Sequence, residues 1–175
     1  MDDPDRWVRY AARLAIMRVS PDAWVDDVLK DDVTKRPAGA LEGLLAIVHL
    51  DAYPDYQDVV LSKLAADADS TMSDDALLRY LRVTQLAIIR AGGFDAVPAD
   101  DVTKIRTALH PRFPNGDWRI DRELQVTLCG LNDEDAIGPM LTHLESTEDA
   151  AEQMHTVYAL RTLKSGWSKP NRDRL

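Results

Sequence analysis

The 175-residue chain has one cysteine, two phenylalanines and no apolar run approaching the roughly 20 residues that a membrane helix needs. A single cysteine, Cys129, excludes an internal disulfide, a Cys-rich zinc site and the paired cysteines of a c-type haem attachment. Its position between Leu128 and Gly130 predicts a small buried side chain. The acidic start Met1-Asp2-Asp3 is not a signal peptide, so the export signal of an exported parent protein would lie upstream.

The chain has fewer basic than acidic side chains, 21 Lys and Arg against 30 Asp and Glu, which gives a net charge of −9. Residues 1–75 hold 16 acidic and 8 basic side chains, a net −8, whereas residues 76–175 hold 14 and 13, a net −1. An acidic first half repels phosphate backbones, so we predict no binding of nucleic acid.

Patterns that carry catalysis or cofactors are missing too. There is no Gly-x-Ser-x-Gly nucleophile elbow and no P-loop, and Gly92-Gly93 indicates the end of a helix. Glu152-x-x-His155 resembles half of a di-iron site, but such a site needs a second copy, and the other three histidines are dispersed. We therefore predict no catalytic residue, no metal site and no cofactor.

What the chain does contain is one helix signal after another, with no sustained period-2 alternation that would indicate strands. Prolines, capping residues and apolar positions at helical spacing predict helices that begin near residues 5, 21, 37, 54, 74, 98, 118, 136, 148 and 169. In the first helix we expect the inward face to hold Trp7, Val8, Ala11, Leu14 and Ala15.

The predicted helices fall into pairs. Their first members begin near residues 5, 37, 74, 118 and 148, at spacings of 32, 37, 44 and 30 residues. Repeats of this length are typical of α-solenoids of the HEAT or armadillo kind. We predict an all-α fold, one domain over residues 1–175 built from about five helical hairpins. The alternative is a closed helical bundle.

The last predicted helix is short, with about five residues between Pro170 and Leu175. We expect the native chain to continue beyond Leu175, because a terminal repeat normally carries a polar outer face. Met154, Val157 and their apolar neighbours on the preceding helix should then be partly exposed and support weak self-association through this end.

Four stretches carry a family resemblance: DPDRWVRYAARLA at 3–15, LRYLRVTQLAIIR at 78–90, IDREL at 120–124 and EQMHTVYALRTLKSGW at 152–167. Together with Trp24, they resemble the HEAT-like repeat region of large planctomycete-type proteins. Those proteins also carry a dehydrogenase-like β-propeller and a c-type cytochrome domain. The resemblance implies a non-catalytic repeat region, compatible with an exported, periplasmic parent. The family's haem ligands lie in its cytochrome domain, and this chain has no Cys-x-x-Cys-His.

Arg6, Arg9 and Arg13 are the candidate binding residues, since they lie one turn apart in the acidic half. They would bind a carboxylate, a phosphate or an acidic loop of a protein partner. The alternative is a solvated face paired with Asp2, Asp3 and Asp5 or with acidic side chains of the next repeat. Four tryptophans, Trp7, Trp24, Trp118 and Trp167, have apolar neighbours at helix ends and are expected to pack between repeats.

The predicted function is a scaffold, spacer or docking module that contacts a protein partner or flanking domains of the same chain. A second hypothesis is a helical-repeat DNA glycosylase, which would need a basic concave face. A third is a helical bundle that binds a small ligand in a deep apolar cavity.

Overall fold

The computed structural model describes residues 1–175 and confirms the all-α prediction. Helices, with short 3-10 turns included, hold 71% of the residues, and there is no strand. No helix has both the length and the apolar character needed to cross a membrane. The chain divides into two compact units, Met1–Asp101 (unit 1) and Val102–Leu175 (unit 2). That residues 1–175 act as one repeat domain stays a prediction.

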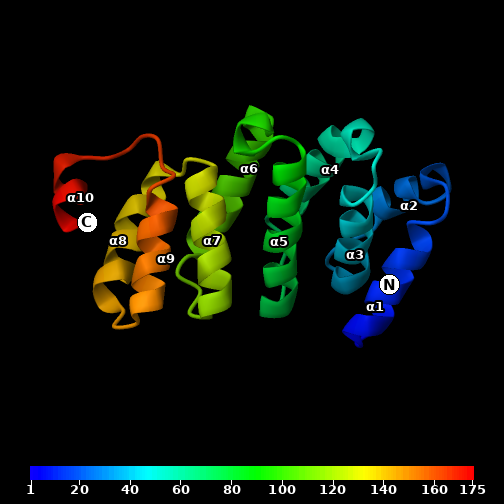
Figure 1. The fold of residues 1–175 in the computed structure, drawn as a ribbon, viewed down its shortest axis with the longest axis horizontal. Helices are drawn as coiled ribbons and strands as arrows, with labels where there is room; N and C mark the ends of the chain where they lie inside the picture. The colour runs from blue at the N-terminus through cyan, green and yellow to red at the C-terminus, as the bar shows by residue number, and fades with distance from the viewer. The chain divides into compact units, whose positions relative to one another are not determined.

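Unit 1 is built from two layers of helices. Its helices are α1 (Arg6–Ile16), α2 (Val25–Lys30), α3 (Pro37–Val48), α4 (Tyr53–Asp67) and α5 (Asp74–Arg90), followed by the start of α6 (Ala99–Leu109). Helix α3 packs between α1 and α5, and α2 and α4 pack against α3 and against each other (Figure 1). The first helices of successive pairs thus form one row, and the second helices form a layer against it.

The starts of these helices follow from local chemistry. Pro37 and Pro54 lie in the first turns of α3 and α4, where the missing N–H costs nothing. Ser73 caps α5, because its side chain accepts from the backbone N–H of Ala76. The Ser20-Pro21 signal gives only a 3-10 turn at Pro21–Ala23, and α2 begins after Trp24, whose φ of −148° interrupts the helix.

Two buried tyrosines join α4 to α5. The Tyr53 hydroxyl donates to the carbonyl of Ala87 at 2.9 Å, and the Tyr80 hydroxyl donates to the carbonyl of Leu64 at 2.8 Å. Both rings are fully buried, and burial raises the pKa of Tyr53 to about 12. A buried hydroxyl without a partner would cost about 1–3 kcal/mol, so these two hydrogen bonds fix how α4 lies on α5.

Unit 2 holds the rest of α6 together with α7 (Trp118–Gly130), α8 (Ile137–Ser146), α9 (Ala150–Leu160) and α10 (Lys169–Arg174). Helix α9 packs against α7 and α8, and α10 packs against α8 (Figure 1). Asp117 caps α7 by accepting from the N–H of Arg119, and hydrogen bonds from Arg119 hold the pKa of Asp117 at about 2. Asp149 caps α9 in the same way.

Two left-handed residues join the ends of α7 and α9. Gly166 has φ of +79°, and a Cβ there would lie 2.6 Å from the Cβ of Glu134, so only glycine fits. Asn132 has φ of +55°, which asparagine tolerates. Its side chain accepts from the N–H of Lys164 at 2.8 Å and donates to the hydroxyl of Ser165 at 2.6 Å. The turn after α7 is thereby hydrogen-bonded to the segment after α9.

Candidate functional site

Glu42, on α3, is surrounded by arginines from both neighbouring helices. Arg13 Nη1 donates to Glu42 Oε2 at 2.9 Å, whereas Arg9 Nε and Arg79 Nη1 lie 3.7 Å and 3.9 Å from Glu42 Oε1. We call these four residues the Glu42 cluster. Three guanidinium groups around one carboxylate leave a local excess of two positive charges, on an otherwise acidic unit. The cluster therefore joins α1, α3 and α5 and leaves positive charge at their common surface.

The three predicted binding arginines do not share one exposed face. Arg9 is buried, and its Nη1 donates to the carbonyls of Asp3 and Pro4. Arg13 is also largely buried against Glu42, and Arg6 alone is exposed. Arg9 and Arg13 pair with Glu42, an acidic side chain of the next predicted hairpin, but they do not lie on the solvated face that the alternative expected, because both are largely buried. That the row binds a partner stays a prediction, and Arg6 is its one member that points to solvent.

The predicted inward face of the first helix is wrong. Trp7, Val8 and Leu14 are exposed, and Arg9 is the one buried residue of α1. The reason is that α1 turns Arg9 and Arg13 toward Glu42, because a carboxylate largely removed from water needs charged partners. The apolar side of α1 consequently faces water.

Four exposed aromatic rings each lie beneath a guanidinium group. The Arg–aromatic pairs, with the distance from guanidinium carbon to ring centroid, are Arg6–Trp7 (4.7 Å), Arg13–Tyr10 (5.3 Å), Arg122–Trp118 (4.8 Å) and Arg161–Tyr158 (4.1 Å). Trp7 and Tyr158 are each 63% exposed, and Trp118 is 57% exposed. We expected all four tryptophans to pack between repeats: Trp24 is buried and Trp167 is half-buried, whereas Trp7 and Trp118 are exposed, so the prediction is wrong for those two.

Sequence reasoning missed these pairs, although a signal was present. In each pair the arginine is one, three or four positions from the aromatic residue, and the last two spacings place side chains on one helix face. The hydrophobic character of these rings, taken alone, predicts that they are buried between helices. Together with the spacing of their arginines, they predict Arg–aromatic pairs on the helix surface.

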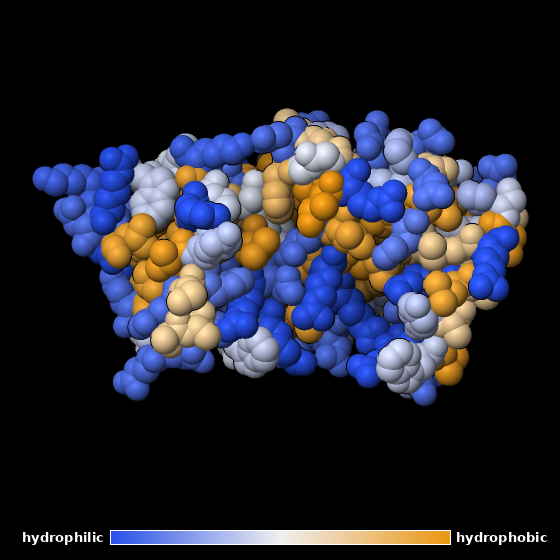
Figure 2. Space-filling model, in the orientation of Figure 1, coloured by the Kyte–Doolittle hydropathy of each residue, from blue (hydrophilic) through white to orange (hydrophobic).

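The outer side of α9 is apolar as well. Met154 and Val157 lie exposed beside Tyr158, which confirms the expectation that this helix is partly bare. With Trp167 and Leu175 they line a groove of about 440 Å³. Figure 2 shows apolar surface gathered over this end of unit 2.

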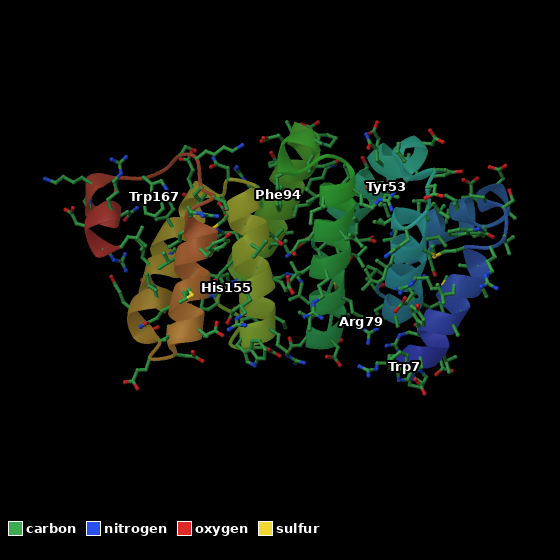
Figure 3. All side chains as sticks on the ribbon, in the orientation of Figure 1. Trp7, Tyr53, Arg79, Phe94, His155 and Trp167 are labelled. Atoms are coloured by element: carbon green, nitrogen blue, oxygen red, sulfur yellow. The ribbon has the colours of Figure 1, made fainter.

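Three of the four histidines, His49, His110 and His155, have a ring nitrogen within hydrogen-bonding distance of a protein oxygen. His155 lies on the side of α9 toward α7, where its Nε2 is 3.2 Å from the carbonyl of Arg122 (Figure 3). Glu152 Oε1 pairs with Arg122 Nη2 at 2.7 Å. His110 Nδ1 lies 2.7 Å from Asp133 Oδ2. The structure contains no group of three His, Cys, Asp or Glu side chains placed to hold a metal ion.

Cys129 is fully buried, as its neighbours predicted. Its thiol packs 3.4 Å from the sulfur of Met140, and burial raises its pKa to about 12, with the charge of Asp133 adding to the shift. The thiol is therefore protonated and serves as part of the apolar core of unit 2.

Comparisons with protein-family models, with curated proteins and with solved structures find no match for this chain.

Proposed function

We propose that the chain is a non-catalytic helical-repeat scaffold, of the HEAT or armadillo kind, that docks a protein partner or flanking domains of a larger protein. The observation that carries this proposal is the set of Arg–aromatic pairs exposed on α1, α7 and α9. The resemblance to the repeat region of planctomycete-type multidomain proteins points in the same direction.

Exposed Arg–aromatic pairs have the composition and rigidity that protein interfaces favour. Trp, Tyr and Arg are the residues most enriched among those that dominate protein–protein binding energy. Each ring offers a large contact area with only two rotatable bonds, and a guanidinium above it restricts it further. Less conformational entropy is then lost on binding, so exposed Arg–aromatic pairs are well prepared to become buried contacts.

Charge supports a protein partner over nucleic acid. The net charge of −9 opposes a phosphate backbone, which disfavours a helical-repeat DNA glycosylase. A gel-shift assay at low salt separates the two, because a glycosylase would retard duplex DNA.

Alanine substitution tests the proposal. Replacing Trp7 and Tyr158 together should leave the thermal midpoint nearly unchanged, since both side chains are mostly exposed. Co-purification of a partner from the native host should be lost, because removing a dominant interface aromatic costs about 2 kcal/mol or more of binding free energy. Ile89→Ala is the matched control, because Ile89 is an exposed apolar residue that belongs to none of the Arg–aromatic pairs. Undiminished co-purification by the double variant would contradict the proposal.

A further inference from the structure

An apolar groove of about 200 Å³ lies between α3 and α5 of unit 1. We call it the α3–α5 groove. Its lining consists of Leu41, Leu45, Val83 and Leu86 together with Glu42, Arg79 and Arg82. Figure 2 shows this apolar surface over α3 and α5 with hydrophilic surface beside it. The floor of the groove is thus aliphatic, and Glu42 and Arg79 of the Glu42 cluster lie at its edge.

The size of the groove indicates which occupant it fits. Sites for small molecules enclose about 300–1,000 Å³ and bury most of the ligand. About 200 Å³ of open groove is smaller than that, and it suits one or two aliphatic side chains of a peptide lying across the two helices. Leu45 and Leu86 are only half-buried, so apolar surface on both walls is available to such side chains.

Charge indicates what flanks those side chains. Arg79 lies on the side of α5 toward α3, and its contact with Glu42 is long, 3.9 Å (Figure 3). A guanidinium group has five N–H donors, and the Arg79 side chain is 37% exposed. Glu42 already neutralises one charge among Arg9, Arg13 and Arg79, so the excess positive charge favours a second carboxylate at the groove edge.

We propose that the α3–α5 groove binds an acidic, aliphatic peptide segment of a protein partner. A leucine-, isoleucine- or phenylalanine-like side chain enters the groove, and an adjacent Asp or Glu pairs with Arg79. This inference rests on the proposed function and names the partner chemistry for one surface of unit 1. The rest of unit 1 is negatively charged and repels acidic segments. An acidic peptide is therefore expected to bind at the positive edge of the groove and not elsewhere on the unit.

Peptide selection tests the inference. A random peptide display library is panned against the immobilised full chain, and the selected peptides are synthesised and measured by fluorescence anisotropy. The expected sequences place an acidic residue beside a large aliphatic or aromatic one. Arg79→Glu should weaken their binding by at least about tenfold, and raised salt should weaken it as well. Arg18→Glu is the matched control, an exposed arginine that does not line the groove.

Either of two outcomes would overturn the inference: no enrichment of acidic–aliphatic sequences, or equal binding by the wild type and Arg79→Glu. Leu86→Glu, which blocks the apolar wall, provides a second test that does not rely on Arg79. Both variants are checked for an unchanged circular dichroism spectrum. If no such peptide binds the groove while the Trp7 and Tyr158 substitutions still abolish partner capture, the inference about the groove is wrong and the proposed docking function stands. If partner capture is insensitive to those substitutions, the docking proposal fails by itself.

Discussion

Replacing Glu42 with glutamine should lower the free energy of unfolding by about 3–5 kcal/mol. Glutamine keeps the size of the side chain and removes its charge. Arg9 and Arg13 are 4% and 15% exposed, so their charges would remain largely buried without a compensating carboxylate. Removing one partner of a buried ionic group is costly mainly because the other charge is left unpaired.

Urea unfolding followed by circular dichroism measures this effect. Arg79→Gln is the matched control, because Arg79 is more exposed and lies 3.9 Å from the carboxylate. Its cost should be about 0–1 kcal/mol, as for other surface ion pairs. If Glu42→Gln and Arg79→Gln unfold at the same urea concentration, the charge of Glu42 is not what holds Arg9 and Arg13 of α1 against α3.

Leu128→Ala should destabilise the protein by about 2–5 kcal/mol. Leu128 is fully buried on α7, the helix that packs against α9, and it neighbours the buried Cys129. Removing its three terminal carbon atoms loses their transfer free energy and leaves a cavity that a helical core closes only in part.

Urea unfolding measures the loss of stability in Leu128→Ala, and hydrogen exchange shows which helices lose protection. Met154→Ala on α9 is the matched control, because it removes a large apolar side chain that is 73% exposed. Its cost should be within about 0.5 kcal/mol. Leu128→Ala should reduce protection chiefly in the helices of unit 2. A change as small as that of the control would mean that α7 is not part of a packed core.

Sequence reasoning placed the helices well because their starts are local. Pro37, Ser73 and Asp117 act within one turn of the chain, so the starts of α3, α5 and α7 were predicted at the residues where the structure has them. Gly92 and Gly93 end α5 with positive φ angles. Glycine adopts such angles without steric cost, so this helix end could also be predicted from the local sequence.

The orientation of α1 could not be predicted in the same way. Apolar spacing favoured Trp7 and Leu14 as inward, and both are exposed, because Glu42 on another helix draws Arg9 and Arg13 inward. Nothing near Glu42 in the sequence marks it as the partner of three arginines. The contact joins residues about 30 positions apart and is decided by tertiary packing.

The most direct test of a docking scaffold is photo-crosslinking in the native host. A benzophenone amino acid is placed at Tyr158 in one variant and at Asp58 on α4 in another, both of them exposed positions. Tyr158 belongs to an Arg–aromatic pair, whereas Asp58 does not. We expect one discrete crosslinked protein from position 158, identified by mass spectrometry, and none from position 58. The absence of adducts at position 158, or the same adducts at both positions, would contradict it.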